Sequence, residues 1–445
     1  MVEANVAERR AANEIGRTVA GPMSEREKPR ICVVTGGHLS TCPRMLKAAD
    51  ALHEAGYDVR VVSTDFIEWA AEADRDVRKT RPWKWDVVPL RRESNRPAYY
   101  RRGVRHRLFR KLAQAIGPER CPLSIAARAW VKMSPELLSA IRRERCDLIY
   151  GGAGAQAAVA VAGRTMGIPF ALDLEDFHSG EQGGTAKESL SNRLAERIER
   201  LTLTEAAFLT AGSAAIAEAY DRKYGVRPIP INNTFPLPER EPDLTPSDGP
   251  GLKLYWFSQT IGPGRGLEDV IRAMGLAGLP GELHLRGNAS GDYVETLRRQ
   301  SAETAPMLQV VVHPPASPER MVELAQNYDI GLATEPGFSM NNGIALSNKA
   351  FTYILAGLAV VFTDTAGQRP LAVDLGEGAI VYPPGDAATL ATKLKLWAND
   401  KASLARAKAA AWEAARRRWH WEHVLERGAL LDAVAGIVGG GVRCG

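Results

Sequence analysis

Polar side chains precede an apolar run in Gly343 to Asp364, GIALSNKAFTYILAGLAVVFTD. The second half of this stretch predicts a buried helix followed by a buried strand, and Asn348 and Lys349 fall where that helix begins. The first turn of a helix attracts anions, because its backbone N–H groups are unpaired and its dipole is positive there. A lysine conflicts with that dipole, and a bound diphosphate would remove the conflict. The alternative is a lysine that extends into solvent.

A glycine-rich stretch, Ser258 to Gly266 (SQTIGPGRG), is a second candidate anion site. Gly264 allows the backbone to approach a ligand closely, and Ser258 and Gln259 open the stretch as further binding candidates. Arg265 precedes a predicted helix, where its guanidinium can hold a phosphate through paired hydrogen bonds. The stretch lacks the Gly-Lys-Ser/Thr ending of a P-loop, so ATP hydrolysis is not indicated. The alternative is that Arg265 is an ordinary exposed charge.

A group of titratable side chains follows an apolar strand in Ala171 to Glu181, ALDLEDFHSGE. Ligands of doubly wound folds lie beyond the carboxyl ends of the strands, which is where Glu175, Asp176 and His178 are expected. Such a group suits sugar hydroxyls or acid–base chemistry. The alternative is a helix cap followed by exposed charges.

A glycine turn also follows the first predicted strand, in Thr35 to Arg44, TGGHLSTCPR. Gly36 and Gly37 allow close approach of a ligand beside a helix N-terminus. The stretch is not GxGxxG and has no acidic ribose partner at the expected position, so a nicotinamide site is not indicated. A tight turn without a ligand is the alternative.

The segment 91–111 carries nine arginine and lysine residues against one glutamate, with aromatic and leucine side chains interleaved. A basic amphipathic segment of this kind suits an anionic membrane surface. Nucleic acid is not predicted as a partner, because no reading motif accompanies the charge. A solvated basic face is the alternative.

The elements that position these residues alternate between strand and helix along the chain. Buried strands, glycine turns and amphipathic helices recur from about Ile31, and the pattern restarts after a Pro- and Gly-rich stretch. This predicts an α/β protein with two Rossmann-like, doubly wound parallel-sheet domains facing across a cleft. The predicted division is a flexible leader over 1–28, domains over 29–237 and 251–415, a linker over 238–250, a helix over 416–435 that crosses back to the first domain, and a tail over 436–445.

Composition narrows the class of protein. The chain has 445 residues, 45% of them hydrophobic, with a net charge of +5, which is ordinary for a globular protein. Five cysteines without a CxxC pair do not indicate disulfides, and neither a signal peptide nor a membrane-spanning run is predicted. We therefore expect a cytoplasmic protein, with a peripheral location on the inner face of the membrane as the alternative. His420 and His423 have the spacing of ligands on a helix but lack a third ligand nearby, so no metal site is predicted.

Several stretches together resemble family 4 (group 1) glycosyltransferases, which have the GT-B fold. YWFSQTIGPGRGLEDVIRA resembles the strand, loop and helix that meet the donor diphosphate, and SNKAFTYILAGLAVVFTD resembles the variant PNKLFEYLAAGLPVVAT. GIPFALDLEDF resembles GIPxxxxxHDF with Glu175 in place of histidine and Asp176 matching the aspartate, and HWEHV resembles the terminal SWE element. The resemblance extends from about Ile31 to Ala435.

The resemblance implies an enzyme that transfers a sugar from a nucleotide-sugar to a glycan, lipid-linked or small-molecule acceptor. The anomeric configuration would be retained, and neither a metal ion nor a cofactor would be needed. The expected pathway is the assembly of bacterial surface polysaccharide. The donor would bind the C-terminal domain and the acceptor the N-terminal domain. Arg265, Lys349, Glu175 and Asp176 would be the catalytic residues. The candidate substrate-binding residues are Gly36, Gly37, His178, Ser258, Gln259, Gly264, Arg286, Glu335, Asn341, Asn342, Asn348 and Thr352.

The sequence departs from the family at its paired glutamates, which would fall at Ile344 and Thr352. Glu335, Asn341 or Asn342 can replace the first through a shift of the loop, whereas the second has no evident replacement. Two alternatives therefore remain: a catalytically silent nucleotide-binding homologue, and a nucleotide-sugar epimerase or phosphorylase of the same fold.

Overall fold

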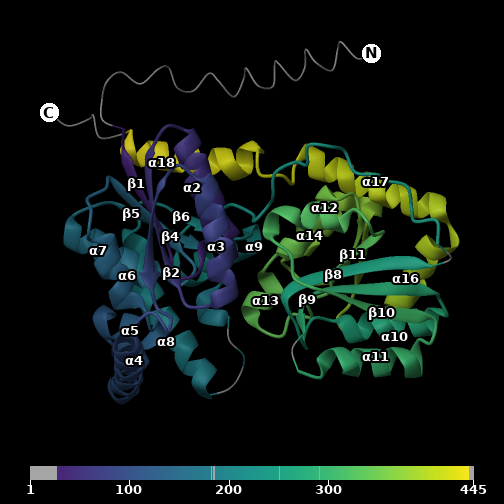
Figure 1. Ribbon diagram of the computed structural model, residues 1–445, viewed down its shortest axis with the longest axis horizontal. Helices are drawn as coiled ribbons and strands as arrows, with labels where there is room; N and C mark the ends of the chain where they lie inside the picture. The colour runs from purple at the N-terminus through teal and green to yellow at the C-terminus, as the bar shows by residue number, and fades with distance from the viewer. Residues whose placement is uncertain (1–27, 182, 184–185, 250, 290, 440–445) are drawn as a thin grey trace, which may run out of the picture.

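The computed structural model describes residues 28–439 except 182, 184, 185, 250 and 290 (Figure 1). Its described residues form two sheets whose strands all pair in parallel. The first has seven strands in the order β3-β2-β1-β4-β5-β6-β7, and the second has six in the order β10-β9-β8-β11-β12-β13. In both sheets the chain starts centrally, moves to one edge and then crosses to the other, which is the doubly wound topology that the sequence predicts.

The first domain contains the strands β1 (Arg30–Thr35), β2 (Asp58–Asp65), β3 (Lys84–Pro89), β4 (Leu148–Gly152), β5 (Phe170–Leu174), β6 (Leu209–Ala211) and β7 (Ile229–Pro230). Its helices are α2 (Pro43–Glu54), α3 (Glu68–Thr80), α4 (Arg96–Ile116), α5 (Leu123–Trp130), α6 (Ser134–Ile141), α7 (Gln156–Met166), α8 (Ala186–Thr202) and α9 (Ala214–Tyr224). Alternate residues of β1 enter different cores: Cys32 and Val34 pack towards α6 and α7, whereas Ile31 and Val33 pack towards α2. A central strand must therefore be apolar on both faces, and the run ICVV meets that requirement.

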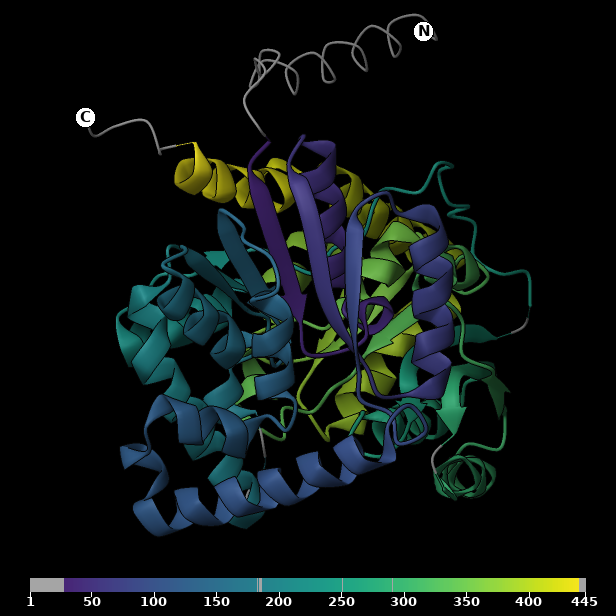
Figure 2. The same cartoon turned by 60° about the vertical axis from the view of Figure 1, so that its left-hand side comes forward.

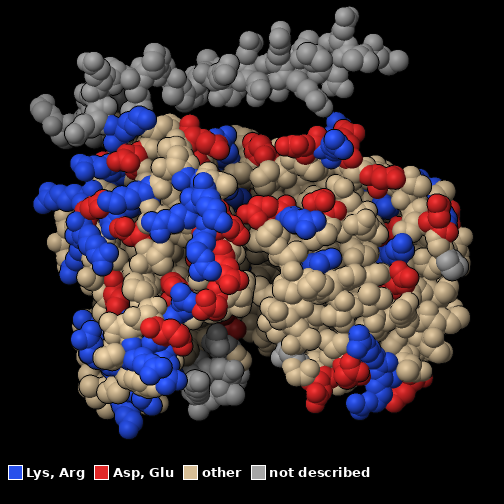
Figure 3. Space-filling view, viewed as in Figure 1, with Lys and Arg blue, Asp and Glu red and all other residues tan. Residues whose placement is uncertain are grey.

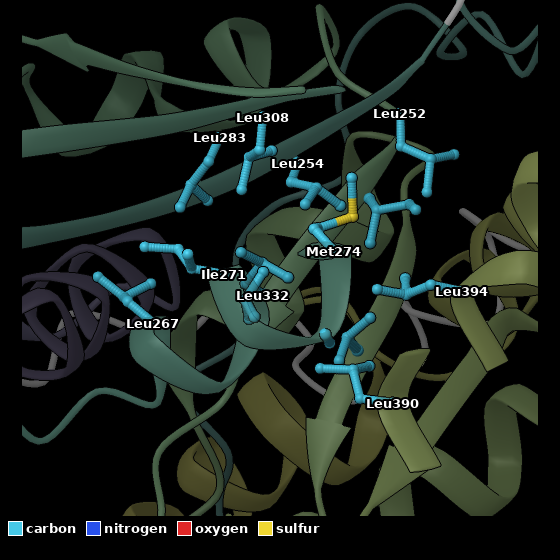
Figure 4. Packing of buried hydrophobic residues seen from close by; sticks show 14 of the residues in the cluster. Leu252, Leu254, Leu267, Ile271, Met274, Leu283, Leu308, Leu332, Leu390 and Leu394 are labelled. Carbon is cyan, nitrogen blue, oxygen red and sulfur yellow. The ribbon is translucent and has the colours of Figure 1, made fainter. Parts of the chain in front are cut away.

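The second domain contains the strands β8 (Leu252–Ile261), β9 (Gly281–Ala289), β10 (Leu308–His313), β11 (Ile330–Ala333), β12 (Ala359–Thr363) and β13 (Ala379–Tyr382). Its helices are α10 (Leu267–Ala277), α11 (Tyr293–Thr304), α12 (Met321–Ala325), α13 (Met340–Ile344), α14 (Asn348–Leu355), α15 (Arg369–Leu375), α16 (Ala387–Asn399) and α17 (Lys401–Arg417). Figure 4 shows one of its cores, where Leu252 and Leu254 of β8 meet Ile271 and Met274 of α10. Each fully buried side chain of this kind stabilises the fold by roughly 1.5–3 kcal/mol.

Two details of the second domain differ from the sequence-based expectation. The glycine loop predicted over Ser258–Gly266 is shorter, because β8 continues to Ile261 and pairs there with Ala289 of β9. A bulge between Phe257 and Thr260 lets the strand extend into the predicted loop. The stretch that contains Asn341 is helical as α13, whose first turn is capped by the hydroxyl of Ser339.

The last helices cross between the domains. α17 packs against the second domain through Ala411 and Trp412, whereas α18 (Ala429–Val438) contributes Leu430 and Val434 to a core of the first domain. Figures 1 and 2 show these yellow helices along one side of the molecule. α18 continues to Val438 and so includes the start of the predicted tail. The predicted leader, apart from Lys28, lies outside the described residues, as does Cys444.

No helix among the described residues is long and apolar enough to cross a membrane.

Candidate active site

A cavity of about 220 Å³ lies between the two domains. In Figure 3 the surface is hollowed between the two halves of the molecule. The described residues that line the cavity are Glu175, Asp176, Gly212, Ile216, Asn233, Arg265, Glu335, Asn342, Ala345, Leu346, Ser347, Asn348, Lys349 and Gln368. All four residues expected to be catalytic are in this set, as are Glu335, Asn342 and Asn348 from the binding candidates.

The second domain supplies a cation and a helix N-terminus to the cavity. α14 begins at Asn348, as predicted, with Ser347 as its cap residue. Lys349 follows in the first turn, where its Nζ lies 2.5 Å from Oε1 of Glu335 and 5.5 Å from the ring centroid of Trp256. The local conflict between a lysine and the helix dipole is thus balanced by an internal carboxylate.

Two acceptor atoms of this wall have no partner among the described residues. Oε2 of Glu335 and Oε1 of Gln368 are both buried without a hydrogen bond, although Nε2 of Gln368 donates to Thr363 Oγ1 at 2.9 Å. Buried acceptors are seldom left unsatisfied in folded proteins, and the exceptions mark sites where another group completes the bonding. These two oxygens therefore suit a ligand that donates hydroxyl hydrogen bonds.

The glycine loop before α10 brings Arg265 to the cavity. The backbone of Gly266 has a φ of +71°, and a Cβ there would lie 2.1 Å from the carbonyl oxygen of Thr334. The Thr334 hydroxyl donates to the Arg265 carbonyl at 2.7 Å, which fixes the loop against the end of β11. The Arg265 guanidinium makes no ion pair or hydrogen bond within the part of the chain that the structure describes. It is therefore available to an anionic ligand.

The first domain supplies carboxyl groups to the opposite wall. Glu175 follows β5, and burial raises its pKa to about 7, with the Arg44 charge opposing this shift and the Asp176 and Asp173 charges adding to it. Asn233 donates to Glu175 Oε1 at 3.4 Å. A neutral or readily protonated carboxyl group at this position can donate as well as accept hydrogen bonds.

Arg44 is the support of this wall that sequence reasoning missed. Its guanidinium binds Asp173 through two hydrogen bonds, 2.9 Å from Nε to Oδ2 and 2.5 Å from Nη2 to Oδ1, and Nη1 donates to the Ile231 carbonyl. Both side chains are almost fully buried. The position of Arg44 in the first turn of a helix could have indicated this role. The helix dipole disfavours an arginine there unless a carboxylate pairs with the guanidinium.

Asp176 connects the two domains instead of only facing the cavity. Nδ2 of Asn341 donates to Asp176 Oδ1 at 2.8 Å, and Oδ1 of Asn341 accepts from the Phe177 backbone N–H at 2.7 Å. The Ser213 hydroxyl adds a bond of 3.1 Å to the Ile344 carbonyl. α13 is thereby attached to the first domain beside the cavity, and Asn341 acts there as an interdomain contact.

His178 is buried beside the cavity but does not line it. Its Nδ1 lies 3.3 Å from Glu181 Oε2, and its ring packs edge-on against Trp130 with centroids 5.7 Å apart. Burial opposes protonation of this histidine, but the hydrogen bond and charge of Glu181 outweigh it and raise the pKa to about 9. His178 is therefore a cationic support of the wall.

Other sequence candidates lie away from the cavity. Arg286 is buried and donates from Nε to the Tyr255 hydroxyl at 3.0 Å and from Nη1 to the Pro314 carbonyl at 2.9 Å. Thr352 is 1% exposed on the core side of α14, where it cannot replace the glutamate of the family motif.

The remaining candidates are glycines and residues of β8. Gly36 packs against the backbone at Ala153, where a Cβ would lie 2.7 Å from a carbonyl oxygen, so its requirement is structural. Gly37 is next to it, and Gly264 has a φ of +75° that suits the turn before α10. The last two candidates, Ser258 and Gln259, lie in β8 and do not line the cavity.

No group of three or more His, Cys, Asp and Glu residues suited to a metal ion occurs in the described ranges. Gln368 and Asn233 line the cavity and were not predicted, since neither lies in a recognisable motif.

Comparison with known proteins identifies the fold. Residues 43–232 match the family described as glycosyl transferase 4-like domain. No curated protein matches the chain in sequence. Anabaena Alr3699/HepE, solved with UDP and glucose, is 17% identical with a TM-score of 0.62, covering 92% of this chain and 99% of its own.

Two further solved structures show the same architecture. A Rickettsia africae glycosyltransferase is 11% identical with a TM-score of 0.63, covering 93% of this chain and 100% of its own. Sucrose-phosphate synthase from Thermosynechococcus elongatus is 14% identical with a TM-score of 0.60, covering 92% and 100%. The chain therefore has the GT-B fold of these solved structures, and its residues 43–232 are similar to the glycosyl transferase 4-like domain.

Proposed function

We propose that this protein transfers a sugar from a nucleotide-sugar donor to an acceptor, with retention of the anomeric configuration and without a metal ion. The observation that carries the proposal is the composition of one cavity wall. Arg265, Lys349 and the N-terminus of α14 suit a diphosphate, and the unsatisfied oxygens of Glu335 and Gln368 suit hydroxyl groups. A nucleotide-sugar presents both kinds of group within one molecule.

The cationic groups would act on the leaving group. Negative charge develops on the nucleoside diphosphate as the bond to the sugar breaks, and fixed cations near it lower the free energy of the transition state. Lys349 is held by Glu335 without ligand, so donor binding would redistribute that ion pair. Arg265, whose guanidinium has no described protein partner, would bind the diphosphate directly.

The carboxyl groups of the first domain would contact the sugar and the acceptor. Glu175 and Asp176 stand on the wall opposite the cations, where they can hydrogen-bond to hydroxyl groups. In front-face displacement the departing diphosphate takes the acceptor proton, so no carboxylate base is required. The acceptor is a glycan, lipid-linked or small molecule, and we place the activity in cytoplasmic assembly of bacterial surface polysaccharide.

A panel of nucleotide-sugars tests the proposal. Thermal stability is measured with each donor, starting with UDP-sugars because HepE was solved with UDP and glucose. The product is then analysed by NMR for its anomeric configuration, with and without EDTA. We expect stabilisation by one donor, a retained configuration and activity in EDTA. Binding without transfer or hydrolysis would support a silent homologue, and no binding by any nucleotide would contradict the proposal.

A further inference from the structure

The helix α4 has an outward face that is apolar and basic at once. Tyr100, Val104, Leu108, Leu112 and Ile116 are all exposed, at intervals of four residues. They form a stripe about 24 Å long that winds around the exposed side of the helix, because four residues are slightly more than one turn. Val104 and Leu108 are 58% and 60% exposed, far more than leucine and valine side chains usually are in a folded protein.

Cations lie beside this stripe. Arg96, Arg101, Arg107 and Lys111 are exposed, and none of them forms an ion pair with a described residue. Figure 3 shows arginine and lysine side chains at the lower left end of the molecule, where Figure 1 labels α4. α4 itself contains no acidic residue.

Several cations of the basic segment 91–111 are bound to other residues of the protein and are not available to a partner. Arg102 is buried and donates to the Pro89 and Leu90 carbonyls, and Arg105 pairs with Glu136 at 2.6 Å. Arg91 pairs with Asp65 and Glu68. Segment 91–111 is therefore not uniformly a binding face, and the exposed apolar stripe extends beyond it to Ile116.

We infer that the outward face of α4 binds the surface of an anionic lipid bilayer, with the stripe inserted between headgroups and the four cations over them. An apolar stripe beside unpaired cations is the composition of an interfacial helix. The phosphate backbone of a nucleic acid would use the cations but leave the leucines without a contact. Figure 1 shows α4 at the lower left of the molecule, and in Figure 2 it is the long blue helix along the lower edge, so a flat surface can approach it from outside.

Co-sedimentation with vesicles tests this inference without any donor, so its outcome is independent of the proposed sugar transfer. The full chain is mixed with vesicles of equal phosphatidylglycerol and phosphatidylcholine, or of phosphatidylcholine alone. We expect binding to the anionic vesicles at about 0.05 M salt, weakened at about 0.5 M salt because the headgroup charge is then screened. No binding to the anionic vesicles at low salt overturns the inference.

Matched variants assign the binding to α4. Leu108→Gln with Leu112→Gln should lower the partition coefficient between vesicles and water by about tenfold. The two substitutions remove exposed apolar surface, and the helix should persist because glutamine is a good helix former. The control is Leu276→Gln with Leu396→Gln, which are 63% and 65% exposed on helices of the other domain and should leave binding unchanged. Equal loss in both pairs overturns the inference.

A second variant separates charge from apolar contact. Arg101→Gln, Arg107→Gln and Lys111→Gln together should abolish the preference for phosphatidylglycerol, whereas Arg298→Gln, Arg299→Gln and Lys395→Gln should not. The alternative is that a second copy of the chain covers the apolar face of α4. Light scattering tests this alternative, because it measures whether the protein is a dimer. A dimer that Leu108→Gln with Leu112→Gln dissociates would overturn the lipid assignment.

Discussion

Lys349 and Glu335 form an ion pair within the cavity between the domains, with Nζ and Oε1 2.5 Å apart. Both side chains are largely shielded from solvent, at 14% and 9% exposed. The cation that we propose for the donor diphosphate is therefore already paired, and the diphosphate must compete with a carboxylate of the protein.

Replacing Glu335 tests this competition. Glu335→Gln leaves Lys349 without its anion, so we expect nucleoside diphosphate to bind about tenfold more tightly, equivalent to about 1.4 kcal/mol. Transfer should slow nevertheless, because the glutamine amide keeps only one uncharged acceptor oxygen for the sugar hydroxyls. Calorimetric binding and kcat are measured on the same preparation. Binding that is unchanged or weaker would show that Glu335 does not compete.

Removing the cations should affect the chemical step. We expect Arg265→Ala and Lys349→Ala each to lower kcat by about a hundredfold, equivalent to about 2.7 kcal/mol of transition-state stabilisation. Arg299→Ala, an exposed arginine on α11, is the control and should leave turnover unchanged. Normal turnover in both cavity variants would remove the diphosphate clamp from the proposal.

The contact made by Asn341 should control how the domains are held together. Asn341→Ala removes the partners of Asp176 and of the Phe177 N–H, and unsatisfied groups of this kind cost about 1–3 kcal/mol each when they stay buried. We expect the domains to separate, with a larger radius of gyration in solution scattering and a higher KM for the donor.

Asn342→Ala is the control for this contact, because Oδ1 of Asn342 accepts from Gly337 N–H within the second domain. Its radius of gyration should equal that of the unmodified protein. An unchanged radius for Asn341→Ala would mean that the remaining contacts, such as Ser213 with Ile344, are sufficient to hold the domains.

The pairing of His178 predicts a pH dependence of stability. The pKa of His178 is raised from 6.5 to about 9, so the folded state binds a proton that the unfolded state releases in this range. The pairing therefore stabilises the fold fully below pH 6.5, and this contribution is lost as the pH rises through 9.

Glu181→Gln should lower the free energy of unfolding by about 1 kcal/mol just below pH 6.5, where Glu181 is ionised and His178 is protonated; the value is modest because water screens the partly exposed Glu181. The difference should vanish above the pKa of about 9. Denaturant unfolding at several pH values measures it, with the exposed Glu303→Gln as control. A loss of stability that is independent of pH would contradict the charged state of His178.

Sequence patterns were sufficient to predict the individual strands, helices and turns. The run ICVV, the start of α14 at Asn348 and the glycine turns all follow from chemistry within a few residues, and each is found in the structure. The second sheet was predicted equally well, except that β8 continues through Ser258 to Ile261, where pairing with β9 overrides the loop character of the sequence.

The contacts of the site that could not be predicted from the sequence join residues that lie far apart along the chain. Arg286 follows Leu283 and Leu285 in the stretch ELHLRGN and was expected to bind substrate. Its guanidinium instead donates to the Tyr255 hydroxyl and the Pro314 carbonyl, both distant in sequence. Arg44 and Asp173 are 129 residues apart, so no local pattern indicates that they meet. Asn341 was expected to bind substrate, and its partner Asp176 lies 165 residues earlier.

The crossing of the last helices has a consequence for biosynthesis. Leu430 and Val434 complete a core of the first domain, and Glu426 accepts from both the backbone N–H and the side chain of Asn232 at 2.5 and 2.8 Å. During translation the first domain therefore emerges with part of its apolar surface uncovered. It acquires this cover only after the second domain has been synthesised, so a chain that ends before residue 434 leaves the ribosome with an open core in its earliest-made half.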